Sequence, residues 1–100
     1  MAVSFEWDEE KAAVNQRKHG VSFAEAATVF GNPLAVIFDD PEHSMEELRE
    51  IIVGHSDRER LLVVSFTERE GVIRIISARK ATPRERRDYE ENPFGGWSNE

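Results

Sequence analysis

Residues 73–89 read IRIISARKATPRERRDY, a β-rich apolar run that continues directly into a basic helical segment. The isoleucines favour a strand at the start of this stretch. Thr82 and Glu85 fit a capping box and Pro83 fits the first helical position, so together they predict a helix start. Six cations oppose two acids here and leave a local charge of +4, whereas the whole chain carries −7. Positive charge gathered on one strand–helix unit of an acidic protein suggests a polyanion partner.

The composition limits the classes of protein to consider. One hundred residues suffice for one domain with a modest core. The absence of cysteine removes disulfides and thiolate metal sites, which fits a cytoplasmic protein. His19, His43 and His55 lie far apart without metal-ligand spacing, so we expect neither a metal nor a cofactor. No window approaches the roughly 20 apolar residues of a membrane span, and the N-terminus does not read as a signal peptide.

Capping and periodicity predict the remaining elements. Asp8 and Gly20 bracket a helix from about 9 to 18, and Ser22 with Glu25 opens a second helix. A short strand at 5–7 precedes them. β-rich runs follow at 34–38, 49–56, 61–67 and 72–77.

The predicted order is therefore β-α-α-β-β-β-β-α. Short links make the later strands antiparallel neighbours. We expect an α+β domain over residues 1–91, in which an antiparallel β-sheet carries two N-terminal helices and a C-terminal helix on one face. Residues 92–100 read as a tail.

Arginines of the last strand are the first candidates for chemistry. Strict alternation puts Arg79 on one strand face with Ile73, Ile75 and Ser77, and Arg74 on the other with Val72, Ile76 and Ala78. An arginine on a central, apolar strand is partly desolvated and needs an anion. That anion is either an acid of the protein, such as Glu47 or Glu68, or a bound phosphate, which a guanidinium binds through two hydrogen bonds.

The final helix leaves similar alternatives open. Arg84, Arg86 and Arg87 alternate with acids, which is typical of a solvated face. Tyr89 either packs its ring, as most helix tyrosines do, or stacks on a base or transfers a proton.

Several motifs in order along the chain resemble the BrnT family of bacterial toxins. They are FEWD at 5–8, KHGVSF at 18–23, His43 and Ser44 with Glu47 and Arg49, RLL at 60–62, TER at 67–69, and RIISAR at 74–79 with Glu85, Arg86 and Tyr89. The resemblance spans about residues 5–91. It implies a RelE-like fold and a ribonuclease toxin of a type II toxin–antitoxin system, which inhibits translation and growth. It also implies a BrnA-type ribbon–helix–helix antitoxin, through which alone the toxin would meet operator DNA.

Metal-independent RNA cleavage needs an activated 2′-OH, charge stabilisation at phosphorus and an acid for the leaving oxygen. For this chemistry, Arg79 and Arg69 are expected to stabilise the phosphate, with Arg74 next, and Tyr89 to stack on a base or assist proton transfer. His19, His43 and Glu47 are the acid–base candidates, although His43, Glu47 and Arg49 could equally hold the loop before the following strand. The expected RNA-binding cations are Lys18, Arg49, Arg74, Lys80, Arg84 and Arg86.

The central expectation is that guanidinium groups leaving the last strand face an open cleft. The alternative function is a non-catalytic module whose basic strip docks an acidic protein, because a net charge of −7 does not favour general RNA affinity.

Overall fold

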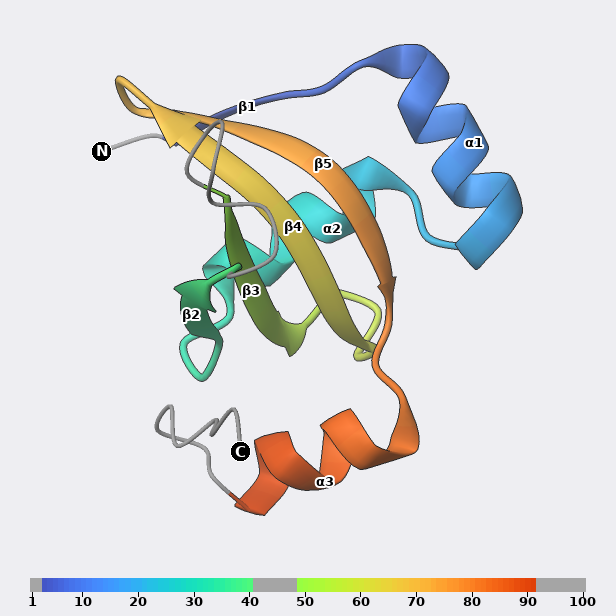
Figure 1. Cartoon of the computed structure of the whole chain (residues 1–100), viewed down its shortest axis with the longest axis vertical. Helices are drawn as coiled ribbons and strands as arrows, with labels where there is room; N and C mark the ends of the chain where they lie inside the picture. The colour runs from blue at the N-terminus through green and yellow to red at the C-terminus, as the bar shows by residue number, and fades with distance from the viewer. Residues whose placement is uncertain (1–2, 41–48, 92–100) are drawn as a thin grey trace.

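A five-stranded mixed sheet forms the centre of this α+β protein (Figure 1). The computed structural model describes residues 3–40 and 49–91, and its strands lie in the order β1-β5-β4-β3-β2. Their bounds are β1 Ser4–Glu6, β2 Val36–Asp39, β3 Glu50–His55, β4 Leu61–Arg69 and β5 Val72–Lys80. Strands β2 to β5 are antiparallel neighbours, as predicted. The prediction of a wholly antiparallel sheet is wrong at β1, which pairs in parallel with β5. No tight turn sets the direction of β1, because most of the chain separates the two strands.

Helices begin and end at the predicted caps. Their bounds are α1 Glu9–His19, α2 Phe23–Thr28 with the 3₁₀ turn η1 Val29–Gly31, and α3 Pro83–Glu91. The Asp8 carboxylate accepts from two backbone N–H groups of the first turn of α1, and Gly20 ends that helix with a left-handed φ of 71°. Ser22 caps α2, and Thr82 and Glu85 form the full capping box of α3. None of the described helices is long and apolar enough to cross a bilayer.

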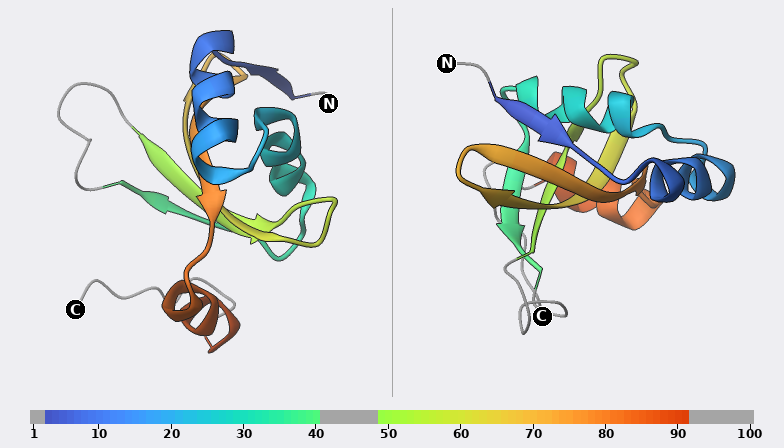
Figure 2. Two further views of the ribbon diagram at one scale, coloured as in Figure 1. Left: turned by 90° about the vertical axis from the view of Figure 1, so that its right-hand side faces the viewer. Right: turned by 90° about the horizontal axis from the view of Figure 1, so that it is seen from above.

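The sheet carries a hydrophobic cluster on each face. On one face, Phe23, Val29 and their neighbours from α2 and η1 pack on Leu62 and Val64. On the other, Tyr89 of α3 packs on Val53, Leu61 and Val63. The prediction that all helices lie on one face is therefore wrong for α3, and both views of Figure 2 place α3 across the sheet from α2. Successive strand residues point to opposite faces, so strands apolar on both sides need a cover on each.

A bulge in β5 changes which residues share a face. Phe66 pairs with Ile75 and Ser65 pairs with Ser77, so Ile76 is an extra residue on β5. Beyond the bulge the alternation is reversed. Ala78 joins the buried face of Ile75, while Arg79 turns to the opposite face, which Arg74 shares. The prediction that Arg74 and Arg79 point to opposite faces is therefore wrong.

Asn15 fastens α1 to the outer edge of β5. Its side-chain amide nitrogen donates to the Val21 carbonyl at 3.0 Å and to the Ala78 carbonyl at 2.8 Å. Its oxygen accepts from the Ala78 N–H at 3.2 Å. Because β1 pairs with β5 only from Val72 to Arg74, Asn15 acts at Ala78 as a neighbouring strand would.

Gly54 of β3 allows η1 and the following loop to approach the sheet closely. A Cβ atom there would lie 2.7 Å from the Cβ of Ala35 and 3.2 Å from the side-chain oxygen of Asn32. We expect Gly54→Ala to lower the free energy of unfolding by about 1–3 kcal/mol through overpacking. Urea denaturation measures this, with Gly31→Ala as control, because a Cβ at Gly31 meets no atom within 4 Å. Equal stability of the two variants would contradict this packing.

Candidate functional site

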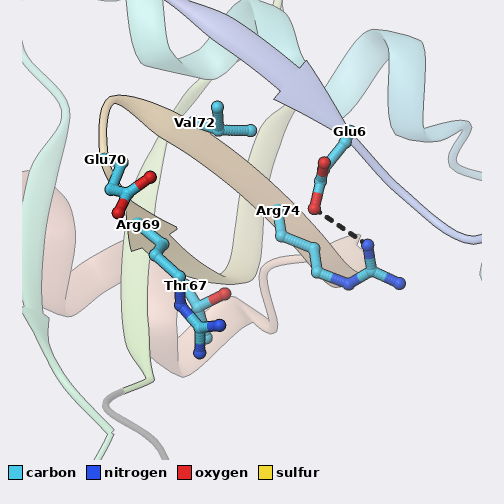
Figure 3. Close-up of a pocket in the computed structure, with 6 residues that line it drawn as sticks. All are labelled: Glu6, Thr67, Arg69, Glu70, Val72 and Arg74. Carbon is cyan, nitrogen blue, oxygen red and sulfur yellow. Dashed lines mark hydrogen bonds and ion pairs between the residues drawn. The ribbon is translucent and has the colours of Figure 1, made fainter.

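An open depression of about 480 Å³ lies at the hairpin end of the sheet (Figure 3). The depression and α3 lie on the same face of the sheet, at opposite ends of it. The lining of the depression combines cationic, acidic and hydroxyl side chains from β1, β4, β5 and the turn between the last two. The residues are Glu6, Thr67, Arg69, Glu70, Val72 and Arg74.

The registers of three adjacent strands build the depression. Arg74 of β5 pairs with Glu6 on one side and with Thr67 on the other, so the three form a row across the sheet. Their chain neighbours Phe5, Ile73 and Phe66 belong to the hydrophobic cluster under α2. The three polar side chains must therefore point to the opposite face. Strands are about 4.8 Å apart, so the row spans roughly 10 Å, the scale of one nucleotide unit.

The two arginines of the depression differ in their partners. Arg74 donates from Nη1 to Glu6 Oε2 at 3.0 Å, and both side chains are about half exposed. Across the described part of the chain, no hydrogen bond or ion pair engages the guanidinium of Arg69, which is exposed at the end of β4. Arg69 therefore offers a complete set of donors to an anion in the depression.

Arg79 is paired within the protein. Its two terminal nitrogens donate to the two carboxylate oxygens of Glu85 at 2.8 and 2.9 Å. This pairing lowers the pKa of Glu85 and raises that of Arg79. Of the two alternatives for this arginine, an internal acid or a bound phosphate, the structure shows the internal acid. The anionic partner of Arg79 is Glu85. The sequence had suggested Glu68 or Glu47; Glu68 is not the partner, and Glu47 lies outside the described residues. The physical reason is the bulge at Ile76, which turns the Arg79 side chain to the sheet face that α3 covers. Glu85 lies in the first turn of that helix.

Tyr89 is a packing residue in this structure. Its side chain is buried, and its hydroxyl donates to the Leu34 carbonyl at 2.8 Å. The His55 ring lies edge-on with a centroid separation of 5.8 Å, and burial raises the pKa of the tyrosine hydroxyl. The ring is thus covered and the hydroxyl engaged, so neither alternative role of stacking on a base or transferring a proton has the geometry it needs here.

The other predicted residues are spread over the molecule. Lys18 and His19 line a separate depression between α1 and β5, together with Val14 and Ile76. Lys80, Arg84 and Arg86 are exposed at the end of β5 and on α3, and Arg49 is half-buried just before β3. His43 lies outside the described residues, as does Glu47. The structure thus brings Arg69 and Arg74 together and leaves the remaining cations apart.

Sequence reasoning missed Glu6 and Thr67 as members of the depression. Both lie in motifs of the family resemblance, FEWD at 5–8 and TER at 67–69, without a predicted role of their own. Alternation gives a weak signal for each, since each follows a phenylalanine in a strand, but only the strand pairing brings them beside Arg74.

A buried acid network lies away from the depression. The Glu25 side chain is 6% exposed and accepts from the Ser56 hydroxyl at 2.7 Å and from Arg60 through two nitrogens, Nε at 2.9 Å and Nη2. The hydrogen bonds from Arg60 are the main cause of a lowered pKa at Glu25. The network joins α2 to the β3–β4 turn, so its role is structural.

The lowered pKa of Glu25 makes stability depend on pH. A carboxyl whose folded pKa lies below its unfolded value of 4.5 stabilises the protein above that value, and this contribution is lost as the pH falls through the folded pKa. We expect Glu25→Gln to raise the unfolding equilibrium constant roughly tenfold or more at pH 7. In urea denaturation at pH 7, 5 and 3, the difference from wild type should shrink as the pH falls. Glu68→Gln, at an exposed position, is the control, and a difference independent of pH would contradict this assignment.

Comparisons with known proteins agree with the resemblance seen in the motifs. Residues 7–85 match the family described as "Ribonuclease toxin, BrnT, of type II toxin-antitoxin system". The fold is similar to the 1.1 Å crystal structure of the Brucella abortus ribonuclease toxin BrnT, with a TM-score of 0.64 and 24% sequence identity. That match covers 81% of this chain and 99% of the Brucella chain. No curated protein matches the chain at a significant level.

Proposed function

Because the chain belongs to the BrnT family of ribonuclease toxins of type II toxin–antitoxin systems, we propose that it is an endoribonuclease that cleaves RNA without a metal ion. The depression at Arg69 and Arg74 is the proposed phosphate-binding site. The observation that carries this assignment is the guanidinium of Arg69, which has no partner within residues 3–40 and 49–91 and lies beside Arg74 and Thr67 in an open hollow of the sheet.

The chemistry needs only groups that RNA and this face supply. The 2′-OH of one nucleotide attacks the adjacent phosphorus, the bond to the 5′-oxygen breaks, and a 2′,3′-cyclic phosphate and a 5′-OH result. Negative charge develops on the non-bridging oxygens, and a fixed guanidinium stabilises it more in the transition state than in the substrate. Arg69 is the proposed donor, Arg74 a second one, and the Thr67 hydroxyl a hydrogen-bonding group between them.

Arg79 has a positioning role in this proposal. Its bidentate pair with Glu85 joins the end of β5 to the capping box of α3. This fixes the direction in which the chain leaves the sheet. Lys80 and Arg84 follow on this path, and they are proposed contacts for the RNA backbone beyond the cleaved bond, where each phosphate contact adds to the salt dependence of binding.

The proposed cellular role follows from the family. In the cytoplasm the enzyme would cleave RNA, inhibit translation and so arrest growth. A BrnA-type ribbon–helix–helix antitoxin would neutralise it and connect it to operator DNA. A RelE-like assignment of the fold belongs to the same proposal. An antitoxin that covers the depression would block RNA and could pair Arg69 with an acidic segment.

Expression without an antitoxin tests the function directly. We expect growth arrest, and we expect the purified protein to cut RNA in the presence of EDTA to fragments ending in 2′,3′-cyclic phosphate. A harmless protein that leaves RNA intact would contradict the enzymatic proposal. Stoichiometric, salt-resistant binding to an acidic partner without cleavage would instead support the non-catalytic docking module.

A further inference from the structure

Glu6 is an acid inside the depression, and the phosphate-binding role of Arg69 and Arg74 does not explain it. It is the last residue of β1 and lies in the row with Arg74 and Thr67. The Arg74 guanidinium holds its carboxylate at 3.0 Å, and the Glu6 side chain remains 52% exposed. Figure 3 shows the carboxylate extending along the depression toward the Arg74 guanidinium.

We propose that Glu6 is the general base of the cleavage reaction, an inference that rests on the proposed ribonuclease function. A base for the 2′-OH must be ionised, oriented and reachable from solvent. Arg74 orients the carboxylate through one of its oxygens, and the half-exposed position leaves the other oxygen accessible to a substrate hydroxyl.

The row places the proposed base, Glu6, directly beside the proposed phosphate donor, Arg74. Two strand spacings of about 4.8 Å separate Glu6 from Thr67, with Arg74 between them. In the proposed arrangement, the phosphate binds at Arg74 and Arg69 and the preceding ribose lies on the β1 side, beside Glu6. There the 2′-OH gives its proton to the Glu6 carboxylate as its oxygen bonds to phosphorus. The 5′-oxygen leaves and takes a proton from water.

Glu70 is the other acid that lines the depression. It lies in the hairpin turn with a left-handed φ of 55°, outside the row of paired strand residues. Within the described residues, no arginine holds its carboxylate in a fixed position. Glu70 therefore has the charge of a base without the orientation.

The test compares Glu6→Gln with Glu68→Gln in the full chain, because Glu68 is an exposed acid of β4 that does not line the depression. The single-turnover rate is measured on a short RNA, and affinity is measured on a 2′-O-methyl oligonucleotide of the same sequence, which cannot be cleaved. We expect Glu6→Gln to lower the rate about a hundredfold or more with affinity within about threefold of wild type. Glu68→Gln should change the rate less than threefold, and Glu6→Asp should restore part of the rate.

Three results would overturn the inference. A Glu6→Gln variant that cleaves within threefold of the wild-type rate removes Glu6 from the chemistry and leaves the ribonuclease proposal standing. A rate loss matched by an equal loss of affinity shows that Glu6 acts only by positioning Arg74. A wild-type protein that binds and cleaves no RNA overturns the proposed function together with the base assignment.

Discussion

Replacing Arg69 with Ala should lower the rate of RNA cleavage about a hundredfold to a thousandfold, the usual cost of removing one transition-state donor. Arg69 is exposed, belongs to neither hydrophobic cluster and has no partner among the described residues. The stability of the protein should therefore change by less than about 0.5 kcal/mol. Single-turnover cleavage of a short RNA and urea denaturation measure the two effects separately.

Two further variants make the result specific. Arg69→Lys keeps the charge and loses the planar fork, so its rate should fall between those of wild type and Arg69→Ala. Arg17→Ala removes an exposed cation of α1 that lies outside the depression, and it should leave the rate unchanged. Equal rates for Arg69→Ala and Arg17→Ala would show that the unpaired guanidinium does not meet phosphate.

Asn15→Ala should be the most damaging substitution for stability, at about 2–4 kcal/mol. The variant removes three hydrogen bonds and leaves the N–H and carbonyl of Ala78 and the carbonyl of Val21 without this partner. A buried polar group left unsatisfied costs about 1–3 kcal/mol, and water entering the gap would recover part of the loss. The shift in urea midpoint measures the effect.

The neighbouring residue supplies the control for Asn15. Gln16→Ala in the same helix turn is an exposed change and should alter stability by less than about 0.5 kcal/mol. A similarly small effect of Asn15→Ala would mean that α1 does not depend on its attachment to β5.

Local signals predicted the helices well, because capping is local chemistry. Asp8, Ser22 and Thr82 each cap a helix as expected, and Gly20 ends α1. These features depend on groups within about three residues of one another, so the sequence pattern contains the needed information. The short strand links likewise predicted the antiparallel order of β2 to β5.

Features that depend on distant residues were missed. Ile76 looks like a regular strand residue, and only its lack of a partner across β4 reveals the bulge that reverses the side of Arg79. Arg79 was expected to bind phosphate, yet its guanidinium pairs with the carboxylate of Glu85, which lies six residues later at the start of α3. Arg69, which pairs with no acid in the part of the chain that the structure describes, is the stronger candidate. Glu6 joins the site only through the parallel pairing of β1 with β5.

The most direct test of the phosphate site follows the arginine side chains themselves. An NMR titration with a 2′-O-methyl oligonucleotide monitors the Nε–Hε signal of each arginine while the fold remains intact. We expect the largest changes at Arg69 and Arg74, with Arg79 changing little because Glu85 already holds it. Changes confined to Arg84, Arg86 and Arg87 on α3, with Arg69 and Arg74 unaffected, would contradict the assignment of the open sheet face as the RNA site.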